Sequence, residues 1–252
     1  MFKGLFKKKK KVSWRQREDR IISRVVAKVE SDTEKIVRTA LSRSRYSYDV
    51  SHLAKLTASL DSAEYYAGHL LAAVHHSDRE RMLDAAAKRC SGNGLILEFG
   101  VATGRSINRL AEHFPSQTIY GFDSFEGLPE TWQPNFQKGA FAQKVPEVSS
   151  NVNLHVGWFD VTLPSFVEQH ANEKVAFLHV DCDLYSSTKT IFQNLRGMIQ
   201  PGCLILFDEY FNYPGWRGHE FKAFQEFIGE NNLQYRYLDV VPSHNQVCIE
   251  IL

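Results

Sequence analysis

The stretch Leu95-Ile-Leu-Glu-Phe-Gly-Val-Ala-Thr-Gly104 decides how this chain folds. Its first residues, Leu95–Leu97, form a short apolar run, which is typical of a strand buried on both faces of a parallel sheet. Glu98, Gly100 and Gly104 follow, and a helical pattern of apolar residues comes next. A strand, a glycine-containing turn and a helix N-terminus together form a site for a nucleotide-like ligand. Glycine admits the ligand close to the backbone, and free N–H groups face it.

The spacing of the polar residues narrows the class of ligand. A dinucleotide loop has Gly-x-Gly-x-x-Gly and a phosphate loop has Gly-Lys-Ser/Thr, whereas this loop has acid-x-Gly-x-Ala-x-Gly, with Ala102 in the middle position. Asp123 ends the next expected strand, nineteen residues after Gly104. A carboxylate there can accept hydrogen bonds from both hydroxyls of a ribose. An aspartate that only starts a turn is the alternative, but the position of Asp123 after the glycine loop favours the ribose.

Strands and helices alternate through the rest of the chain. Expected strands lie at 95–99, 118–122, 152–156, 175–180 and 203–207, and expected helices at 105–114, 162–171, 187–199 and 218–230. This alternation predicts a parallel sheet with right-handed crossovers and helices on both faces. Two further strand-like runs, 234–240 and 246–252, predict a closing antiparallel hairpin. We therefore expect an α/β fold with a doubly wound, mainly parallel sheet of seven strands.

Composition divides the chain into three regions. Residues 1–14 form a basic tail with five consecutive lysines, residues 15–90 read as a helical extension, and residues 91–252 contain the expected sheet. Residues 1–24 carry a net charge of +8, so the remainder carries −7 although the whole chain is +1. The four scattered cysteines form no Cys-x-x-Cys pair, which favours a reducing cytoplasm. No apolar run approaches the ~20 residues that a membrane-spanning helix needs.

Acidic residues gather where two neighbouring strands are expected to end. Asp181 and Asp183 follow the fourth strand, and Asp208 and Glu209 follow the fifth. Ligands of a doubly wound sheet bind beyond these strand ends, and carboxylates that meet there repel unless a cation or hydrogen bonds compensate. Oxygen ligands without a cysteine cluster or paired histidines favour Mg²⁺ or a related divalent ion over zinc. Alternatively, one acid caps the next helix while another binds the ligand of the glycine loop.

Five motifs in a fixed order carry a resemblance to a known family. They are Glu98-x-Gly-Val-x-x-Gly104, Asp123-Ser-Phe-Glu-Gly-Leu-Pro129, Gly157-Trp-Phe-Asp-Val-Thr-Leu-Pro164, Asp181-Cys-Asp-Leu-Tyr-Ser-Ser-Thr188 and Phe207-Asp-Glu-Tyr210. Together they resemble the macrocin O-methyltransferase family, whose members methylate sugar hydroxyls on natural products and related glycosides. The resemblance covers about residues 95–230 and implies the Rossmann-like fold of class I methyltransferases, with S-adenosylmethionine as methyl donor and a divalent ion such as Mg²⁺.

The resemblance also implies roles for individual residues. Glu98, Gly100 and Gly104 line the methionine part of the donor, and Asp123 binds its ribose. We add Ala102, Ser106, Ser124 and Asp160 to the donor site, because they lie within or beside the same motifs.

The implied metal set is Asp181, Asp208 and Glu209, with Asp181 also nearest the acceptor hydroxyl. The family usually has Asp-Asp where this chain has Asp208-Glu209, and it typically has glycine at the position of Cys182. Methyl transfer is a direct displacement at the sulfonium methyl, so the site must align donor and acceptor and activate a poorly nucleophilic hydroxyl. Asp181 is the first candidate for the base that accepts the proton, and His219, after the fifth strand, is the second.

Several alternatives stay open. The acceptor is a small molecule or a glycan, and polysaccharide, glycolipid and small glycoside all remain. A metal-dependent methyltransferase of catechols or phenols, or a non-catalytic binding protein on the same fold, would share these motifs. The tail 1–14 places apolar residues beside its lysines, which is typical of contact with an anionic membrane, here the inner face. We expect no nucleic acid partner, because residues 25–252 are net acidic. The extension 15–90 is expected to contact the acceptor or to form a homo-oligomer surface.

Overall fold

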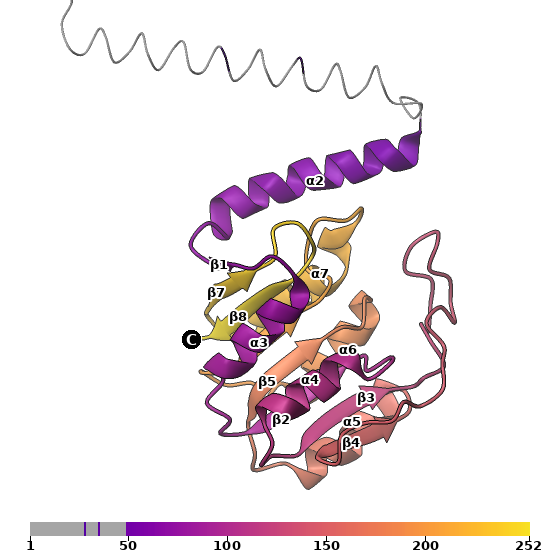
Figure 1. Cartoon of the computed structure of the whole chain (residues 1–252), viewed down its shortest axis with the longest axis vertical. Helices are drawn as coiled ribbons and strands as arrows, with labels where there is room; N and C mark the ends of the chain where they lie inside the picture. The colour runs from indigo at the N-terminus through magenta and orange to yellow at the C-terminus, as the bar shows by residue number, and fades with distance from the viewer. Residues whose placement is uncertain (1–27, 29–34, 36–48) are drawn as a thin grey trace, which may run out of the picture. The chain divides into compact units, whose positions relative to one another are not determined.

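The computed structural model describes Lys28, Lys35 and residues 49–252 (Figure 1). The basic tail 1–14 and its expected membrane contact lie outside the described residues. Two compact units divide between Leu53 and Ala54, and the unit Ala54–Leu252 contains the sheet. Within the described residues, no helix combines the length and apolarity that crossing a bilayer requires.

The sheet has eight strands in the order β1-β7-β8-β6-β5-β2-β3-β4. Their bounds are β1 Val74–His75, β2 Leu95–Phe99, β3 Ile119–Asp123, β4 Val152–Val156, β5 Val175–Val180, β6 Leu204–Phe207, β7 Tyr235–Val240 and β8 Val247–Ile251. Strand β8 pairs antiparallel with β6 and β7, and every other pair is parallel. The predicted doubly wound sheet with a closing hairpin is therefore confirmed, and the two-residue strand β1 adds an eighth strand at its edge.

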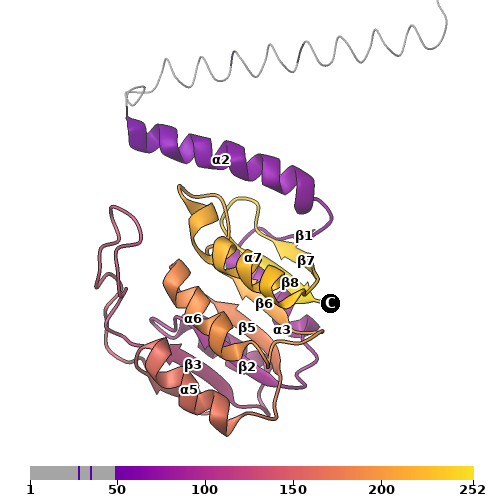
Figure 2. The same ribbon diagram turned by 180° about the vertical axis from the view of Figure 1, so that it is seen from behind.

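Helices cover both faces of this sheet. These helices are α3 Arg79–Arg89, α4 Arg105–His113, α5 Phe159–Gln169, α6 Tyr185–Leu195 and α7 Glu220–Asn231. The chain also has the helix α2 Val50–His69 and a 3₁₀ turn, η1, at Trp216–Gly218. Helices α3 and α4 lie on one face (Figure 1) and α5, α6 and α7 on the other (Figure 2). Each face has its own apolar core, one containing Met82 and Ile107 and the other Phe166, Ile191 and Phe224. Burial of the apolar side of each helix in these cores holds the helices to the sheet.

The loops after β2, β5 and β6 are aligned by backbone hydrogen bonds that continue the strand pairing. The Asp181 N–H donates to the Phe99 carbonyl at 2.9 Å, and the Asp208 N–H donates to the Val180 carbonyl at 2.9 Å. These bonds bring the glycine loop and both aspartates to one edge of the sheet. That edge is where a doubly wound fold binds its ligands.

Candidate active site

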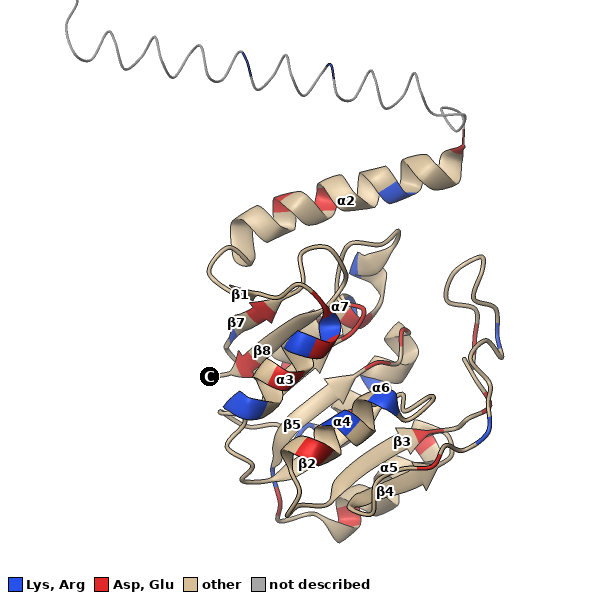
Figure 3. Cartoon of the chain, in the orientation of Figure 1, with Lys and Arg blue, Asp and Glu red and all other residues tan. Residues whose placement is uncertain are grey.

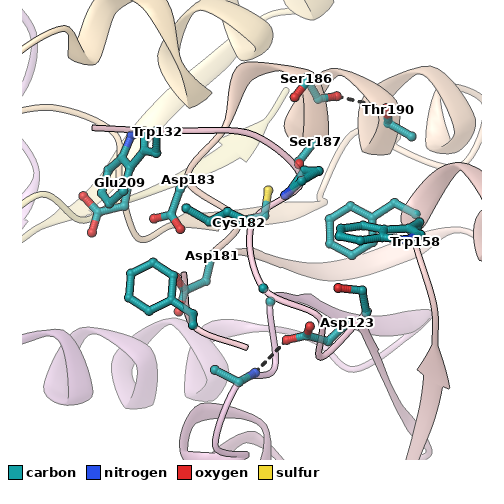
Figure 4. A pocket seen from close by; sticks show the side chains of 18 of the residues that line it. Asp123, Trp132, Trp158, Asp181, Cys182, Asp183, Ser186, Ser187, Thr190 and Glu209 are labelled. Atoms are coloured by element: carbon teal, nitrogen blue, oxygen red, sulfur yellow. Dashed lines mark hydrogen bonds between the residues drawn. The ribbon is translucent and has the colours of Figure 1, made fainter. Parts of the chain in front are cut away.

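A cavity of about 710 Å³ opens at the carboxyl ends of the central strands. Residues from the loops after β2, β3, β5 and β6 line it, together with the N-terminal part of α6. In the view of Figure 4, Asp123 and Trp158 lie at one end of the pocket and Glu209 at the other, with Asp181 and Cys182 between them. The structure thus places the predicted ribose acid and the predicted metal acids around one cavity.

Asp123 is held in place by the backbone of the glycine loop. Its Oδ2 accepts the Ala102 N–H at 2.8 Å, and its Oδ1 accepts the Phe125 N–H at 2.7 Å. Ala102 has a φ of 46°, which lets its N–H point at the carboxylate across the loop. A carboxylate has about four acceptor positions, so two remain for a ligand.

Five of the eight predicted donor residues line the cavity, namely Gly100, Ala102, Asp123, Ser124 and Asp160. Glu98 does not, because it is fully buried behind the loop. Its two carboxylate oxygens accept from the Ser106 hydroxyl at 2.9 Å and from the His179 Nδ1–H at 2.8 Å. Gly104 precedes α4 with a φ of 79°. Direct contact of Glu98, Gly104 and Ser106 with the donor stays a prediction.

The acids after β5 and β6 form a crowded cluster. Burial and neighbouring carboxylates raise the pKa of Asp181 well above its usual range. Burial and the charge of Asp208 raise the pKa of Asp183 to about 7, and burial raises the pKa of Glu209 to about 8. Within the described residues, Arg79 is the one Lys or Arg that lines the cavity, and its Nη1 lies 3.5 Å from Asp208 Oδ2. A site with this excess of acid favours cationic ligands.

Glu220, which no sequence motif indicates, connects two of these loops. This fully buried carboxylate accepts the N–H groups of Cys182 at 3.3 Å and Asp183 at 3.1 Å through Oε1. Its Oε2 accepts the Glu209 N–H at 3.2 Å. A single glutamate at the start of a helix carries no spacing signal, so only the folded chain shows that it positions the acidic loops.

One group of side chains in the described part of the chain is spaced to hold a metal ion. His179, Asp181 and Asp208 each offer a ligand atom within 4.8 Å of the other two. Glu209, the third predicted ligand, is not in this group, and its Oε2 instead accepts a hydrogen bond from the Asn245 amide. Two carboxylates and an imidazole are a donor set that fits a divalent cation. The role of Glu209 as a ligand stays a prediction.

His219, the second predicted base, lies outside the cavity lining. It is half-buried at the start of α7, between the rings of Trp132 and Tyr213 at centroid distances of 6.5 and 6.1 Å. Burial lowers the pKa of His219, which keeps the imidazole neutral at neutral pH. Of these three side chains only Trp132 lines the cavity, so a catalytic role for His219 stays a prediction.

An aromatic wall that the sequence analysis missed closes one side of the cavity. Trp132, Phe136 and Phe141 line it from the long loop between β3 and β4, which projects beyond the sheet in Figure 1. Trp132 and Phe136 lie 5.3 Å apart between ring centroids, and Phe136 stacks on Phe141 at 5.1 Å. Ser186, Ser187 and Thr190 of α6 also line the cavity and carry hydroxyls. In Figure 3 the central strands carry few Lys or Arg residues, whereas α3, α4 and the long loop between β3 and β4 carry several.

Comparison with known proteins adds to this geometry. Residues 97–210 match a family profile described as a methyltransferase domain. An 8-demethyl-8-(2,3-dimethoxy-alpha-L-rhamnosyl)-tetracenomycin-C 4'-O-methyltransferase from Streptomyces olivaceus is 27% identical over 143 residues, which cover 46% of this chain and 53% of that protein. The match thus spans about half the length of that relative.

Two solved methyltransferases have a similar fold. The calicheamicin methyltransferase CalS11 aligns with a TM-score of 0.56 and 22% identity over 88% of this chain and 92% of its own. A second, apo structure of CalS11, titled as a TDP-rhamnose 3'-O-methyltransferase, gives a TM-score of 0.51 with 20% identity over 88% and 94% of the two chains. The O-methyltransferase NovP gives 0.53 with 21% identity over 68% and 78%.

Strand order, loop geometry and motif order all agree with these matches. The central strand β2 carries the glycine loop, and the antiparallel pair β7 and β8 closes the sheet. Residues 97–210 therefore match a methyltransferase domain, and the sheet has the Rossmann-like fold of class I methyltransferases.

Proposed function

We propose that the protein transfers the methyl group of S-adenosylmethionine to a hydroxyl of a sugar, with help from a divalent cation such as Mg²⁺. The observation that carries this proposal is the position of Asp181 and Asp208, which line the same cavity as the ribose acid Asp123. The donor brings a positive sulfonium into a cavity that is rich in carboxylates. The same carboxylates suit a cation beside the acceptor hydroxyl.

The chain's own residues would hold the donor at the end of the cavity beside Asp123. The two acceptor positions that Asp123 leaves free suit the two ribose hydroxyls. Gly100 has no side chain, so the donor can lie against its backbone. Ser124 and Asp160 line the same cavity and complete the donor contacts in this proposal.

The acceptor side of the cavity suits a sugar because it is both apolar and hydroxylated. Trp132 and Phe136 offer aromatic faces, and Ser186 and Thr190 offer hydroxyls. A pyranose has one face of C–H groups and a rim of hydroxyls, so both kinds of surface are used. The names of the tetracenomycin relative and of CalS11 both specify a rhamnose unit, which makes deoxysugar glycosides the first acceptors to examine. Polysaccharide and glycolipid acceptors carry the same hydroxyls.

Methyl transfer requires the protein to align donor and acceptor, to activate the acceptor hydroxyl and to remove its proton. A bound divalent cation would lower the pKa of the acceptor hydroxyl. Asp181 and Asp208 would hold that cation, and Asp181 would be the base that accepts the proton of the acceptor hydroxyl. The family resemblance implies Glu209 as a further ligand. Glu220 would keep both acidic loops in register through its three backbone contacts.

A second candidate function is methylation of a catechol or other phenol. The aromatic wall of Trp132, Phe136 and Phe141 favours it, since a flat ring can stack there.

A cytoplasmic location, a homo-oligomer and contact of residues 1–14 with the inner face of a membrane stay predictions.

A methyl-transfer assay tests this proposal. Purified protein receives methyl-labelled S-adenosylmethionine with methyl α-L-rhamnoside, TDP-rhamnose or a catechol, with and without EDTA. We expect labelled rhamnoside and loss of activity with EDTA. In Asp181→Asn we expect kcat to fall by at least about 10²-fold. Glu168→Gln, on the exposed surface of α5, is the control and should keep full activity. Turnover that persists in EDTA and in Asp181→Asn would contradict the cation-assisted mechanism, and label on catechol alone would support the second candidate.

A further inference from the structure

We propose that His179 is a metal ligand and that the cation site is a mixed imidazole–carboxylate site made of His179, Asp181 and Asp208. Glu98 is then the positioning residue that orients the imidazole. This inference rests on the proposed function in one respect, namely that a divalent cation takes part in methyl transfer. It differs from the all-oxygen set of Asp181, Asp208 and Glu209 that the family resemblance implies.

The surroundings of His179 are those of a ligand. The side chain is 3% exposed on strand β5, and its Nδ1–H donates to Glu98 Oε2 at 2.8 Å. Glu98 is itself fully buried and held by the Ser106 hydroxyl at 2.9 Å. In the neutral imidazole, this pairing places the ring proton on Nδ1 and leaves Nε2 with a lone pair. Metal-binding histidines are typically oriented by such a carboxylate.

The second nitrogen of His179 has no partner within the described part of the chain, since Glu98 is its one hydrogen-bonding group there. His179 also lines a second cavity of about 260 Å³, between the sheet and the helices α3 and α4, which Asp181 and Asp208 line as well. The two aspartates line both cavities. A buried imidazole with an unused nitrogen thus lines a space that it shares with two carboxylates, and one ring nitrogen of His179 lies within 4.8 Å of an oxygen of each.

The donor set predicts which metal the site prefers. Mg²⁺ demands a near-ideal octahedron of oxygen ligands and gives up its waters reluctantly. Imidazole nitrogen suits transition ions such as Fe²⁺ and Ni²⁺, and the affinity of a nitrogen- and oxygen-containing site rises from Mn²⁺ through Fe²⁺ to Co²⁺. We therefore expect Mn²⁺ or Co²⁺ to bind more tightly than Mg²⁺. Two aspartates and a neutral histidine carry a charge of about −2, which a divalent cation neutralises.

Arg79 provides a variant with the opposite expected effect. Its side chain is 54% exposed, and its guanidinium lies 3.5 Å from Asp208 Oδ2. A cation bound at Asp208 would compete with the Arg79 guanidinium for this carboxylate, and the two positive charges would repel each other. Removal of the guanidinium in Arg79→Gln should therefore tighten cation binding by a few fold, whereas the loss of a ligand should weaken it.

The test is a metal-binding measurement on the metal-stripped full chain, with no donor or acceptor present. Mn²⁺ is titrated into the protein, and the electron paramagnetic resonance signal of the unbound Mn²⁺ is followed. Electron spin echo modulation then reports whether nitrogen lies at the bound ion. We expect nitrogen modulation in the wild type and its loss in His179→Gln, together with affinity at least 10-fold lower. Glu98→Gln should weaken binding by about 10–100-fold.

His170→Gln is the matched control, because His170 also pairs with a glutamate, Glu173, at 2.6 Å but belongs to no metal-spaced group in the described chain. It should bind Mn²⁺ as the wild type does. Wild-type protein that binds Mn²⁺ without nitrogen modulation would overturn the inference, as would Mn²⁺ affinity unchanged in His179→Gln. Nitrogen modulation in a protein that transfers no methyl group would uphold the site and contradict the proposed function instead. The wild-type spectrum keeps the test valid even where His179→Gln fails to fold.

Discussion

Gly100 lies where the loop after β2 passes close to the backbone after β5. A Cβ at this position would overlap the carbonyl oxygen of Asp181, and the backbone has a φ of +95°. Both facts exclude any other residue without a shift of the two loops. The packing of the protein itself therefore requires a glycine at this position.

We expect Gly100→Ala to lower the free energy of unfolding by roughly 3 kcal/mol or more, because a backbone clash adds to a strained φ. Gly197→Ala is the control, since a methyl group added there would meet no atom within 4 Å and the φ of Gly197 is not positive. It should change stability by less than about 1 kcal/mol. Urea denaturation of the three proteins measures both effects, and equal midpoints for Gly100→Ala and wild type would contradict this account of the loop.

Single residues differ in how far the sequence alone predicts them. The position of Asp123 at the cavity was predictable, because it follows from a spacing along the chain. His179 and Glu220 were not, because one lies inside a strand and the other at a helix start, and their partners come from other loops. Only the pairing of β2 with β5, which sets Glu98 beside His179, shows what these side chains do.

At the scale of elements, periodic segments were predictable and short or irregular ones were not. The buried strands and the amphipathic helices matched their predicted ranges closely, because burial imposes a period on their residues. The strand β1 has two residues and no period. Helix α5 begins at Phe159, three residues before its predicted start, because the Trp158 carbonyl accepts the N–H groups of Val161 and Thr162. The aromatic wall depends on the path of a long loop, which no local pattern indicates.

The contact between α3 and α4 gives a pH-dependent prediction. Arg109 binds Asp84 through two hydrogen bonds of 2.6 and 2.7 Å, and His113 adds one of 2.9 Å. These bonds, led by those of Arg109, hold the pKa of Asp84 at about 2, against 3.8 for an ordinary aspartate. A lowered native pKa stabilises the fold above pH 4, and this stability is lost as the pH falls through 2.

The difference in Tm between wild type and Asp84→Asn should therefore be largest above pH 4 and shrink toward pH 2. Thermal unfolding at several pH values measures it, with Glu168→Gln as a control that shows no such trend. A difference that stays constant from pH 6 to pH 2 would mean that the Asp84 charge does not hold α3 to α4.

At the scale of the whole molecule, the sheet order explains why the site lies where it does. The chain leaves β2 toward β3 and β4 on one side and returns to β5 and β6 on the other. The loops diverge at this switch point and leave a crevice at the carboxyl ends. Donor loop and acidic cluster come from opposite halves of the sheet, so the cavity forms only when both halves have folded together.

Methyl transfer requires donor binding in this crevice, and calorimetric titration with S-adenosylhomocysteine measures that binding. We expect the wild type and Glu168→Gln to bind one molecule per chain. Asp123→Ala should bind about 10- to 100-fold more weakly, because the loss of hydrogen bonds from a carboxylate to the ribose removes roughly 1.5–3 kcal/mol. A folded wild-type protein that takes up no S-adenosylhomocysteine, or an Asp123→Ala variant that binds it equally well, would contradict the account.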